Sequence, residues 1–268
     1  MEVDLFRGAV KFILTTRAEG NFHPASDGFG QRMEKVLRSM KAKDCFSLRT
    51  GFTNIVLEDE DLTFNSYYQD LIWRNASQAD AVFTNQRKRA LAIHNADCPV
   101  GVLFDVYRHR LGFVHLGLAN LYREFNSAEI YSDQSSLEMV FKEMGGDAQN
   151  IIFWFGGGAQ KCCYGKNPQN ENDQRLISRL IKRFGKDVCS EVVSSGPRMG
   201  FTAIDLHKII LKEAYRLKLN LELTIETVLC ASCLGLERNI DCEPGHYWSN
   251  IRDRKNYRSR NAAIAMMA

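Results

Sequence analysis

The sequence predicts an α+β fold in a single compact domain that spans residues 1–268. Three observations support this prediction. Strand-like and helix-like patterns alternate along the whole chain, no internal repeat is visible, and no Pro-rich or Gly/Ser-rich stretch marks a domain boundary. With 45% hydrophobic and 25% charged residues, the chain has an ordinary globular composition and enough length to bury a full core.

Apolar runs in the first 115 residues indicate strands around one helix. Residues 10–15 and 46–48 have the pattern of strands, and residues 30–42 have that of a helix with one apolar stripe. Four further apolar runs, separated by charged turns, lie between Ala79 and His115. We expect these runs to be consecutive strands of one sheet.

The second half of the chain is predicted to be mainly helical. Ser135 and Glu138 form a capping-box pattern before an apolar helical face, and residues 151–155 indicate a strand that runs into the glycine triplet 156–158. Two more amphipathic helices are predicted at residues 176–184 and 204–217. We expect the segment after Gly235 to be a loop-rich closing piece.

Charge and hydropathy exclude several classes of protein. The 35 basic and 32 acidic residues give a net charge of +3, so no field of the whole chain would hold nucleic acid or an anionic membrane. The apolar stretches fall short of the roughly 18 residues that a membrane span needs. The first residues are too charged for a secretory signal. We therefore expect a cytoplasmic protein with reduced cysteines.

Cys98 and His115 are the most suggestive pair for chemistry. They flank two apolar runs, and an antiparallel pair of strands with a turn near residues 107–110 would bring them together. Such a pair suits a nucleophilic cysteine with its base, or two ligands of one metal. Spacing alone favours a simpler interpretation, a buried thiol and a histidine at the edge of a sheet.

Several strings of the sequence match, in order, those of a known family. Residues 95–105 resemble the family's T-A-D-C-x-P-V-L-x-x-D, and residues 114–117 resemble its A-H-A-G-W-R-G. Further matching strings are residues 48–52, 156–164, 204–206, 230–233 and 247–253. Over about residues 10–266 the chain thus resembles the laccase-domain proteins related to YfiH, long called polyphenol oxidases. The resemblance implies mixed β-sheets packed together with helices outside.

The resemblance also implies a function and a metal. The family is associated with purine nucleoside phosphorylase and adenosine deaminase activity that depends on zinc, so it implies a nucleoside and phosphate as small-molecule partners. By resemblance, Cys98 and His115 match two of the family's three metal ligands and are the expected catalytic residues. Phe52 occupies the third ligand position and cannot coordinate a metal. We therefore expect weak zinc binding. Further departures at the site are Thr50, Leu118, Ala119 and Gly157.

Other residues are candidates for a metal or an anion. His94, and less closely His23, could replace the missing ligand. Further along the chain, the sequence offers ligands for a separate structural metal site, namely Cys230, Cys233, Cys242 and His246. The resemblance explains Cys230 and Cys233 without a metal, and a packing role is expected for Cys162 and Cys163.

Two arginines and the glycine triplet are candidates for binding an anion. Arg252 and Arg260 match arginine positions of the family strings, so the resemblance makes them candidates for contacts to a substrate phosphate. Composition alone would make residues 252–260 a solvated tail. The glycine triplet, with Lys161 nearby, could present amide groups to an anion, although it does not match a phosphate loop.

Two functions of different classes remain open. The first is an enzyme acting on purine nucleosides, with a weakened or altered site. The second is a catalytically inactive relative that keeps the fold as a binding or partner protein. Editing of peptidoglycan precursors, a role of some bacterial relatives, is not separated from these by sequence. Multi-copper oxidase chemistry is not expected, because the chain has too few histidine and cysteine ligands for a copper cluster.

Overall fold

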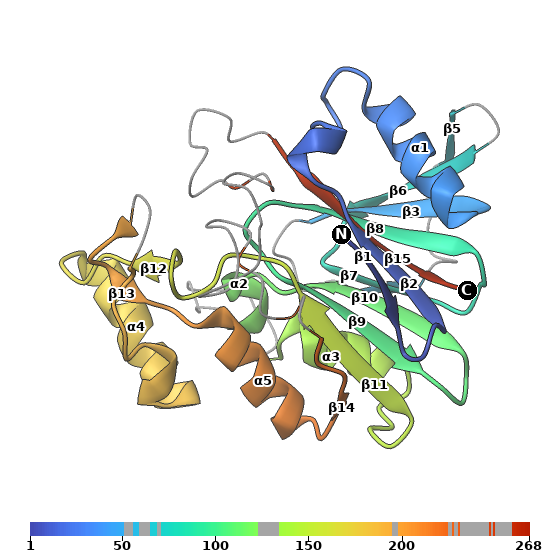
Figure 1. Ribbon diagram of the computed structural model, residues 1–268. Helices are drawn as coiled ribbons and strands as arrows, with labels where there is room; N and C mark the ends of the chain where they lie inside the picture. The colour runs from blue at the N-terminus through green and yellow to red at the C-terminus, as the bar shows by residue number, and fades with distance from the viewer. Residues whose placement is uncertain are drawn as a thin grey trace.

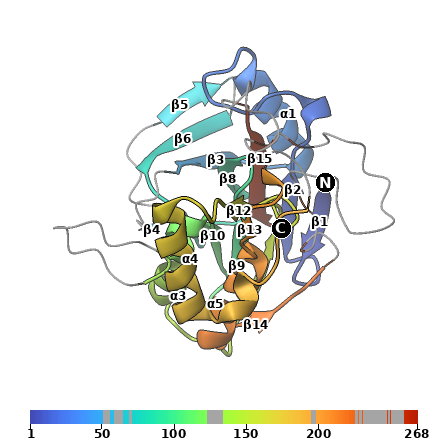
Figure 2. The ribbon, with the colours of Figure 1, turned by 90° about the vertical axis from the view of Figure 1, so that its left-hand side faces the viewer.

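The computed structural model describes most of the chain and confirms an α+β fold. The described residues are 1–50, 56–58, 65–68, 71–122, 134–194, 198–224, 227, 230, 247, 249 and 259–268. Within them, two mixed β-sheets pack face to face, with helices outside both (Figures 1 and 2). This is the layered arrangement that the family resemblance implies.

A seven-stranded sheet forms one of the two central layers. Its strand order is β1-β2-β15-β8-β3-β6-β5, and it mixes antiparallel with parallel pairs. The bounds are β1 Glu2–Leu5, β2 Val10–Leu14, β3 Asp44–Arg49, β5 Asn65–Tyr68, β6 Leu71–Gln78, β8 Arg89–Asn95 and β15 Asn261–Met267. Helix α1 (Phe29–Met40) covers its outer face (Figure 1). The apolar stripe predicted for this helix is confirmed, and its buried members include Met33, Val36, Leu37 and Met40.

A six-stranded sheet forms the second layer. Its order is β14-β11-β9-β10-β7-β4, with bounds β4 Val56–Glu58, β7 Ala81–Thr84, β9 Val100–Asp105, β10 Arg110–His115, β11 Ile151–Gly156 and β14 Asn220–Leu221. Its outer face packs against α3, α4 and α5 (Figure 2). The remaining elements are α2 Leu118–Leu121, α3 Ser136–Glu143, β12 Gly165–Lys166, α4 Glu171–Phe184, β13 Thr202–Ala203 and α5 Leu206–Arg216.

The core between the two sheets is apolar and densely aromatic. Phe12 of the seven-stranded sheet contacts Trp154 of the six-stranded sheet, with ring centroids 4.6 Å apart, and also packs against Phe113. All three side chains are fully buried. Burial of such large apolar surfaces contributes most of the free energy that holds two sheets together.

One expectation about strands is wrong. The four runs between Ala79 and His115 do not form one sheet, because β8 joins the seven-stranded sheet while β7, β9 and β10 form the other. In addition, strand β15, at the end of the segment after Gly235, is not among the strands that the sequence predicts, and it pairs with both β2 and β8. The reason is that periodicity reports burial, whereas membership of a sheet depends on distant pairing.

The predicted helix ends are largely confirmed. The Ser135 hydroxyl accepts a hydrogen bond from the Glu138 backbone N–H at 3.2 Å. The Glu138 carboxylate, however, pairs with Lys142 and Arg216. Gly185 follows α4 as predicted, with φ of 91°.

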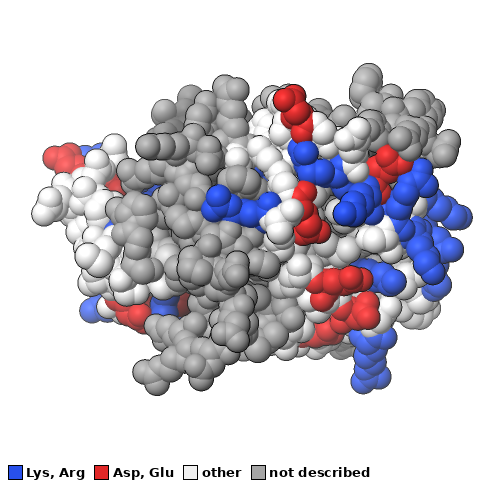
Figure 3. All heavy atoms as spheres, turned by 45° about the horizontal axis from the view of Figure 1, so that its top comes forward, with Lys and Arg blue, Asp and Glu red and all other residues white. Residues whose placement is uncertain are grey.

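The outer surface carries charges of both signs. On the face shown in Figure 3, lysine and arginine side chains gather at one end, and acidic side chains lie among them. None of the helices in the described residues has both the length and the apolar content to cross a membrane.

Candidate active site

Cys98 lies where the chain crosses from one sheet to the other. Residues 96–99 connect β8 of the seven-stranded sheet to β9 of the six-stranded sheet. The Asn95 side-chain amide donates to the Cys98 carbonyl at 2.7 Å, and the Asp97 carbonyl accepts from the Ala159 N–H at 2.7 Å. These bonds hold the crossover in place and leave the Cys98 side chain partly exposed.

His115 reaches Cys98 through the predicted hairpin. Strands β9 and β10 are antiparallel, with His115 opposite Val100, and residues 106–109 form the turn between them. His115 is the last residue of β10, and Cys98 lies two residues before the first residue of β9. The two side chains are hydrogen-bonded to one another. The structure thus brings together the two residues that the sequence singles out.

Asp80 completes the arrangement, and the sequence analysis did not name it. Its carboxylate lies 3.2 Å from His115 Nδ1, and both side chains are buried. A carboxylate only accepts, so the proton lies on Nδ1 and Nε2 is left for Cys98 or a ligand. The pairing of Val114 with Ala81 is the signal that could have found it, because Asp80 immediately precedes that pair.

Electrostatics favour a charged imidazole. Burial lowers the pKa of His115, but the negative charge of Cys98 and the hydrogen bonds with Asp80 and Cys98 outweigh it and raise the pKa to about 9. At neutral pH, His115 is therefore an imidazolium that contacts the Asp80 carboxylate and Cys98. This is a Cys–His–Asp arrangement able to supply a nucleophile or a proton.

Three more polar side chains interact with Cys98 or with its neighbour Asp97. The Ser249 hydroxyl donates to the Asp97 carboxylate at 2.5 Å. Burial raises the pKa of the Tyr164 phenol, and the charge of Cys98 raises it further. Burial lowers the pKa of Arg260, while the charges of Asp97 and Cys98 oppose that effect. Arg260, a predicted phosphate contact, therefore lies within electrostatic reach of Cys98.

The glycine triplet supports the crossover. Gly157 and Gly158 have φ of 68° and 81°, values that side-chain-bearing residues rarely adopt. A Cβ on Gly158 would lie 2.5 Å from the Pro99 nitrogen. The backbone of the triplet thus packs directly against the segment that carries Cys98.

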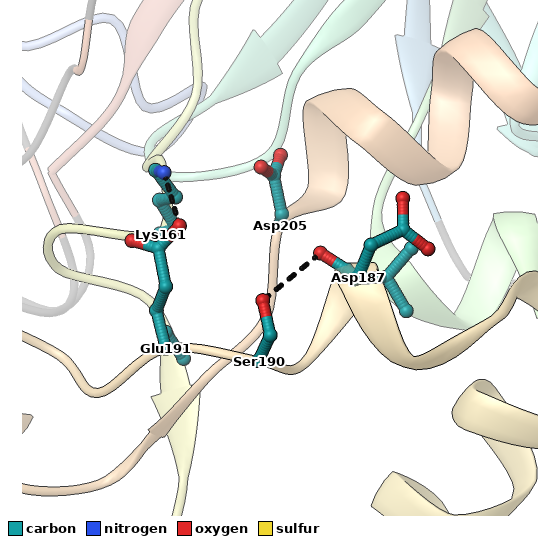
Figure 4. A pocket seen from close by; sticks show the side chains of 7 residues that line it. Lys161, Asp187, Ser190, Glu191 and Asp205 are labelled. Carbon is teal, nitrogen blue, oxygen red and sulfur yellow. Dashed lines mark hydrogen bonds and ion pairs between the residues drawn. The ribbon is translucent and has the colours of Figure 1, made fainter.

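Lys161 does not serve the glycine triplet in the expected way. Its ammonium pairs with Glu191 at 2.6 Å, at the rim of a shallow depression that Asp187, Ser190 and Asp205 also line (Figure 4). Asp205 accepts from the first turn of α5 at 2.8 Å. The polar groups of this depression therefore have structural partners.

The alternative ligands lie elsewhere. His94 is on the face of β8 that it shares with Ala92 and that packs against α1, where its Nε2 lies 2.7 Å from the Ser47 hydroxyl and its ring contacts Phe29. Burial, together with the charge of the nearby His23, lowers the pKa of His94 to about 3. His23 thus lies near His94 rather than at the Cys98 and His115 pair.

The described residues do not fit a three-ligand zinc site at Cys98. Among them, the one group of three histidine, cysteine or acidic donor atoms that lie within 4.8 Å of one another consists of Cys162, Cys163 and Cys230. Cys98 and His115 therefore have no third donor at that spacing among the described residues, whereas catalytic zinc sites have three protein ligands. The predicted site residues outside the described residues are Phe52, Arg252, Cys233, Cys242 and His246.

The fold and the site define a class of protein, an α+β domain of two packed mixed sheets with a Cys–His–Asp site at a crossover. The family model described as multi-copper polyphenol oxidoreductase laccase matches residues 30–267. The chain belongs to this laccase-domain family. Its description makes metal binding a family property, without fixing which metal this chain would hold.

Solved structures share the fold at low identity. A Neisseria meningitidis protein, NMB0706, matches with a TM-score of 0.68 and 15% identity, covering 97% of this chain and 94% of that one. The hypothetical protein YfiH of Bacillus licheniformis matches with a TM-score of 0.66 and 15% identity, covering 97% of this chain and 93% of that one. YlmD of Geobacillus stearothermophilus matches with a TM-score of 0.59 and 15% identity, covering 97% of this chain and 92% of that one. No curated protein matches the chain.

Proposed function

We propose that the protein cleaves the N-glycosidic bond of purine nucleosides with phosphate, at a site formed by Cys98, His115 and Arg260. One observation carries the proposal: Asp80 and Cys98 hold His115 as a buried imidazolium, with the arginine nearby. Phosphorolysis needs an acid for the departing base and a cation for the phosphate. The family resemblance supplies the substrate class.

The chemistry follows from the charges at the site. A phosphate oxygen forms a bond to C1′ of the ribose as the bond from C1′ to the purine nitrogen breaks. His115 donates its proton to the departing purine, and the proton of the phosphate returns to His115 after the transfer. Arg260 offsets the charge of the phosphate. The products are the free purine and ribose 1-phosphate.

Zinc has a limited place in this proposal. When bound in this family, zinc supplies a Lewis acid, and Cys98 with the Nε2 atom of His115 would hold it here. Because Phe52 removes a ligand, we infer that zinc binds weakly, and no step above depends on it. The variant Phe52→His should raise zinc affinity by orders of magnitude in chelator competition, and Cys98→Ala should abolish that gain. An unchanged affinity in folded protein would overturn the ligand assignment.

A direct assay tests the activity. Inosine and adenosine are incubated with phosphate, and the purine base and ribose 1-phosphate are quantified by chromatography with and without a chelator. His115→Ala should lower kcat at least about 100-fold, because it removes the acid. Arg260→Lys should raise the KM for phosphate. His109→Ala, an exposed histidine of the β9–β10 turn, is the matched control. Folded wild-type protein that turns over neither nucleoside would contradict the proposal.

A second candidate is a catalytically inactive member that binds a ligand or partner. Phe52, Leu118 and Ala119 favour it, since each departs from the family string at the site. Calorimetry with inosine and phosphate separates the two. Heat of binding without turnover supports the inactive member, and turnover rules it out.

A further inference from the structure

The three cysteines Cys162, Cys163 and Cys230 come together in a group that does not include Cys98 or His115, the pair that the family resemblance assigns to a metal. Their sulfur atoms all lie within 4.8 Å of one another, although Cys230 is far from the other two in the sequence. All three are thiols rather than halves of a disulfide. We propose that this three-thiol cluster is a second metal site, which binds a soft closed-shell ion, Zn²⁺ or Cu⁺.

The turn that carries two of the cysteines is held by its own backbone. Gln160 accepts hydrogen bonds from the N–H groups of Cys163 and Tyr164, at 2.9 Å and 2.8 Å. Its own N–H donates to the sulfur of Cys230 at 3.4 Å. Backbone donors to sulfur stabilise thiolates at metal centres, and this bond fixes the third sulfur against the turn.

The cluster is sheltered, with one accessible side. Cys163 is 1% exposed and Cys230 is 3% exposed, whereas Cys162 is partly exposed. An ion can therefore reach the cluster past Cys162 and then lose most of its water. Sheltered thiolates that keep one path to solvent meet the requirements of a structural metal site.

The donor set selects the kind of ion. Three sulfur donors suit Zn²⁺ and Cu⁺, whereas Mg²⁺ and Ca²⁺ prefer oxygen ligands. Zinc–sulfur bonds of about 2.3 Å place tetrahedral sulfur ligands about 3.8 Å apart. Sulfur atoms within 4.8 Å of one another need to approach by at most about 1 Å. The two ions share this chemistry, and separate titrations distinguish them.

The cluster also adjoins the active site along the chain. Tyr164, which follows Cys163 directly, lies within electrostatic reach of Cys98, and the glycine turn before the cysteines packs against Pro99. A bound ion would hold this turn against Cys230. The proposal does not depend on the nucleoside activity, because the cluster is separate from Cys98 and His115.

The test uses full-length protein carrying Cys98→Ala, so that the predicted active-site ligand is absent. Reduced, metal-free protein is titrated without oxygen with Zn²⁺ and, separately, with Cu⁺, each against a chromogenic chelator. We expect one ion per chain for at least one metal. Cys162→Ser in this background should weaken binding at least tenfold. Because Cys162 is partly exposed, this variant should fold, and its thermal unfolding checks that.

Two matched measurements make the result decisive. Cys189→Ser changes a thiol outside the cluster and should leave the affinity unchanged. Bound metal should also protect Cys162 from alkylation while leaving Cys98 of the wild type reactive. Failure of the Cys98→Ala protein to bind either ion would overturn the proposal. So would unchanged affinity in folded Cys162→Ser, or a disulfide within the cluster under the reducing conditions used.

Discussion

Two neighbours of His115, Cys98 and Asp80, give the candidate active site its chemical character. Burial alone would favour the neutral ring of His115. The negative charge of Cys98, together with the hydrogen bonds with Asp80 at 3.2 Å and with Cys98, favours the imidazolium instead. Asp80 therefore contributes to the charge of the site, and strand pairing is what reveals its position.

Cys98 should be the most reactive of the described thiols. It is partly exposed beside the imidazolium of His115, whereas burial raises the pKa of Cys189 to about 11 and also raises that of Cys45. Alkylation at limiting iodoacetamide, mapped by mass spectrometry, should modify Cys98 before Cys45, Cys162, Cys163 and Cys189. Asp80→Asn should slow the labelling of Cys98. If Cys98 is labelled no faster than Cys189, it is a core thiol.

His94 should make the fold sensitive to acid. Its pKa is near 3 in the folded protein, against an ordinary value of 6.5, so the unfolded chain takes up the proton first. Its contribution is therefore fully present above pH 6.5 and falls as the pH drops toward 3. We expect the free energy of unfolding to fall by about 1 kcal/mol per pH unit below pH 6.

The variant His94→Gln tests this expectation, because its amide can still form a hydrogen bond with the Ser47 hydroxyl. Urea unfolding of wild type and variant at pH 7 and pH 5 gives the pH dependence of each. The wild type should lose about 1–2 kcal/mol more than the variant between these values. Equal losses would show that another group accounts for the acid sensitivity.

At the scale of elements, the site depends on how two connections pack. The crossover 96–99 carries Cys98 between the sheets, and the turn after β11 supports it through Gly158. Strands β9 and β10 then fix His115 by their register. Cys98 thus lies on a connection and His115 at the end of a strand, and rigid strands hold both, which is a common arrangement for active sites.

The substitution Gly158→Ala should separate packing from backbone strain. Its φ is 81°, and the new Cβ would meet the Pro99 nitrogen at 2.5 Å. Gly8→Ala is the matched control, because Gly8 has φ of 82° and nothing within 4 Å of the added atom. We expect Gly8→Ala to cost about 1–2 kcal/mol in urea unfolding. Gly158→Ala should cost clearly more and also slow the alkylation of Cys98. Equal effects would mean that the contact with Pro99 is unimportant.

At the scale of the molecule, the two sheets and their helices form three apolar layers. One lies between the sheets, one beneath α1, and one beneath α3, α4 and α5. Strand β15 lies between β2 and β8, and its residues contribute to both layers that border the seven-stranded sheet. Its removal would therefore disturb two layers at once.

Ile264→Ala should show how much β15 contributes. Ile264 is fully buried beneath α1, so the truncation should destabilise the protein by about 2–5 kcal/mol. Leu223→Ala deletes a side chain of equal size that is 56% exposed, and it should cost less than about 1 kcal/mol. Both values come from urea unfolding curves. A cost for Ile264→Ala as small as that of Leu223→Ala would contradict the central place of β15.

The sequence predicts those features that local patterns encode. The stripe of α1, the cap at Ser135 and the hairpin of Cys98 and His115 all follow from spacing. Strand β15 was missed because it is buried on both faces and therefore shows no alternation of apolar and polar residues. The sheet of β8, the role of Asp80 and the cluster around Cys230 depend on distant contacts, which no local pattern reports.

The central position of β15 has a consequence for how the chain folds as it is made. The described strands of the six-stranded sheet are complete once residue 221 has left the ribosome, but the seven-stranded sheet is not. Until residues 261–267 emerge, β2 and β8 of a nascent chain each lack the neighbour that later separates them, and unpaired edges of this kind attract other strands. The seven-stranded sheet, which begins at the N-terminus, is therefore completed last. A chain that stalls before residue 261 would leave one edge of β2 and one edge of β8 unpaired and prone to aggregation.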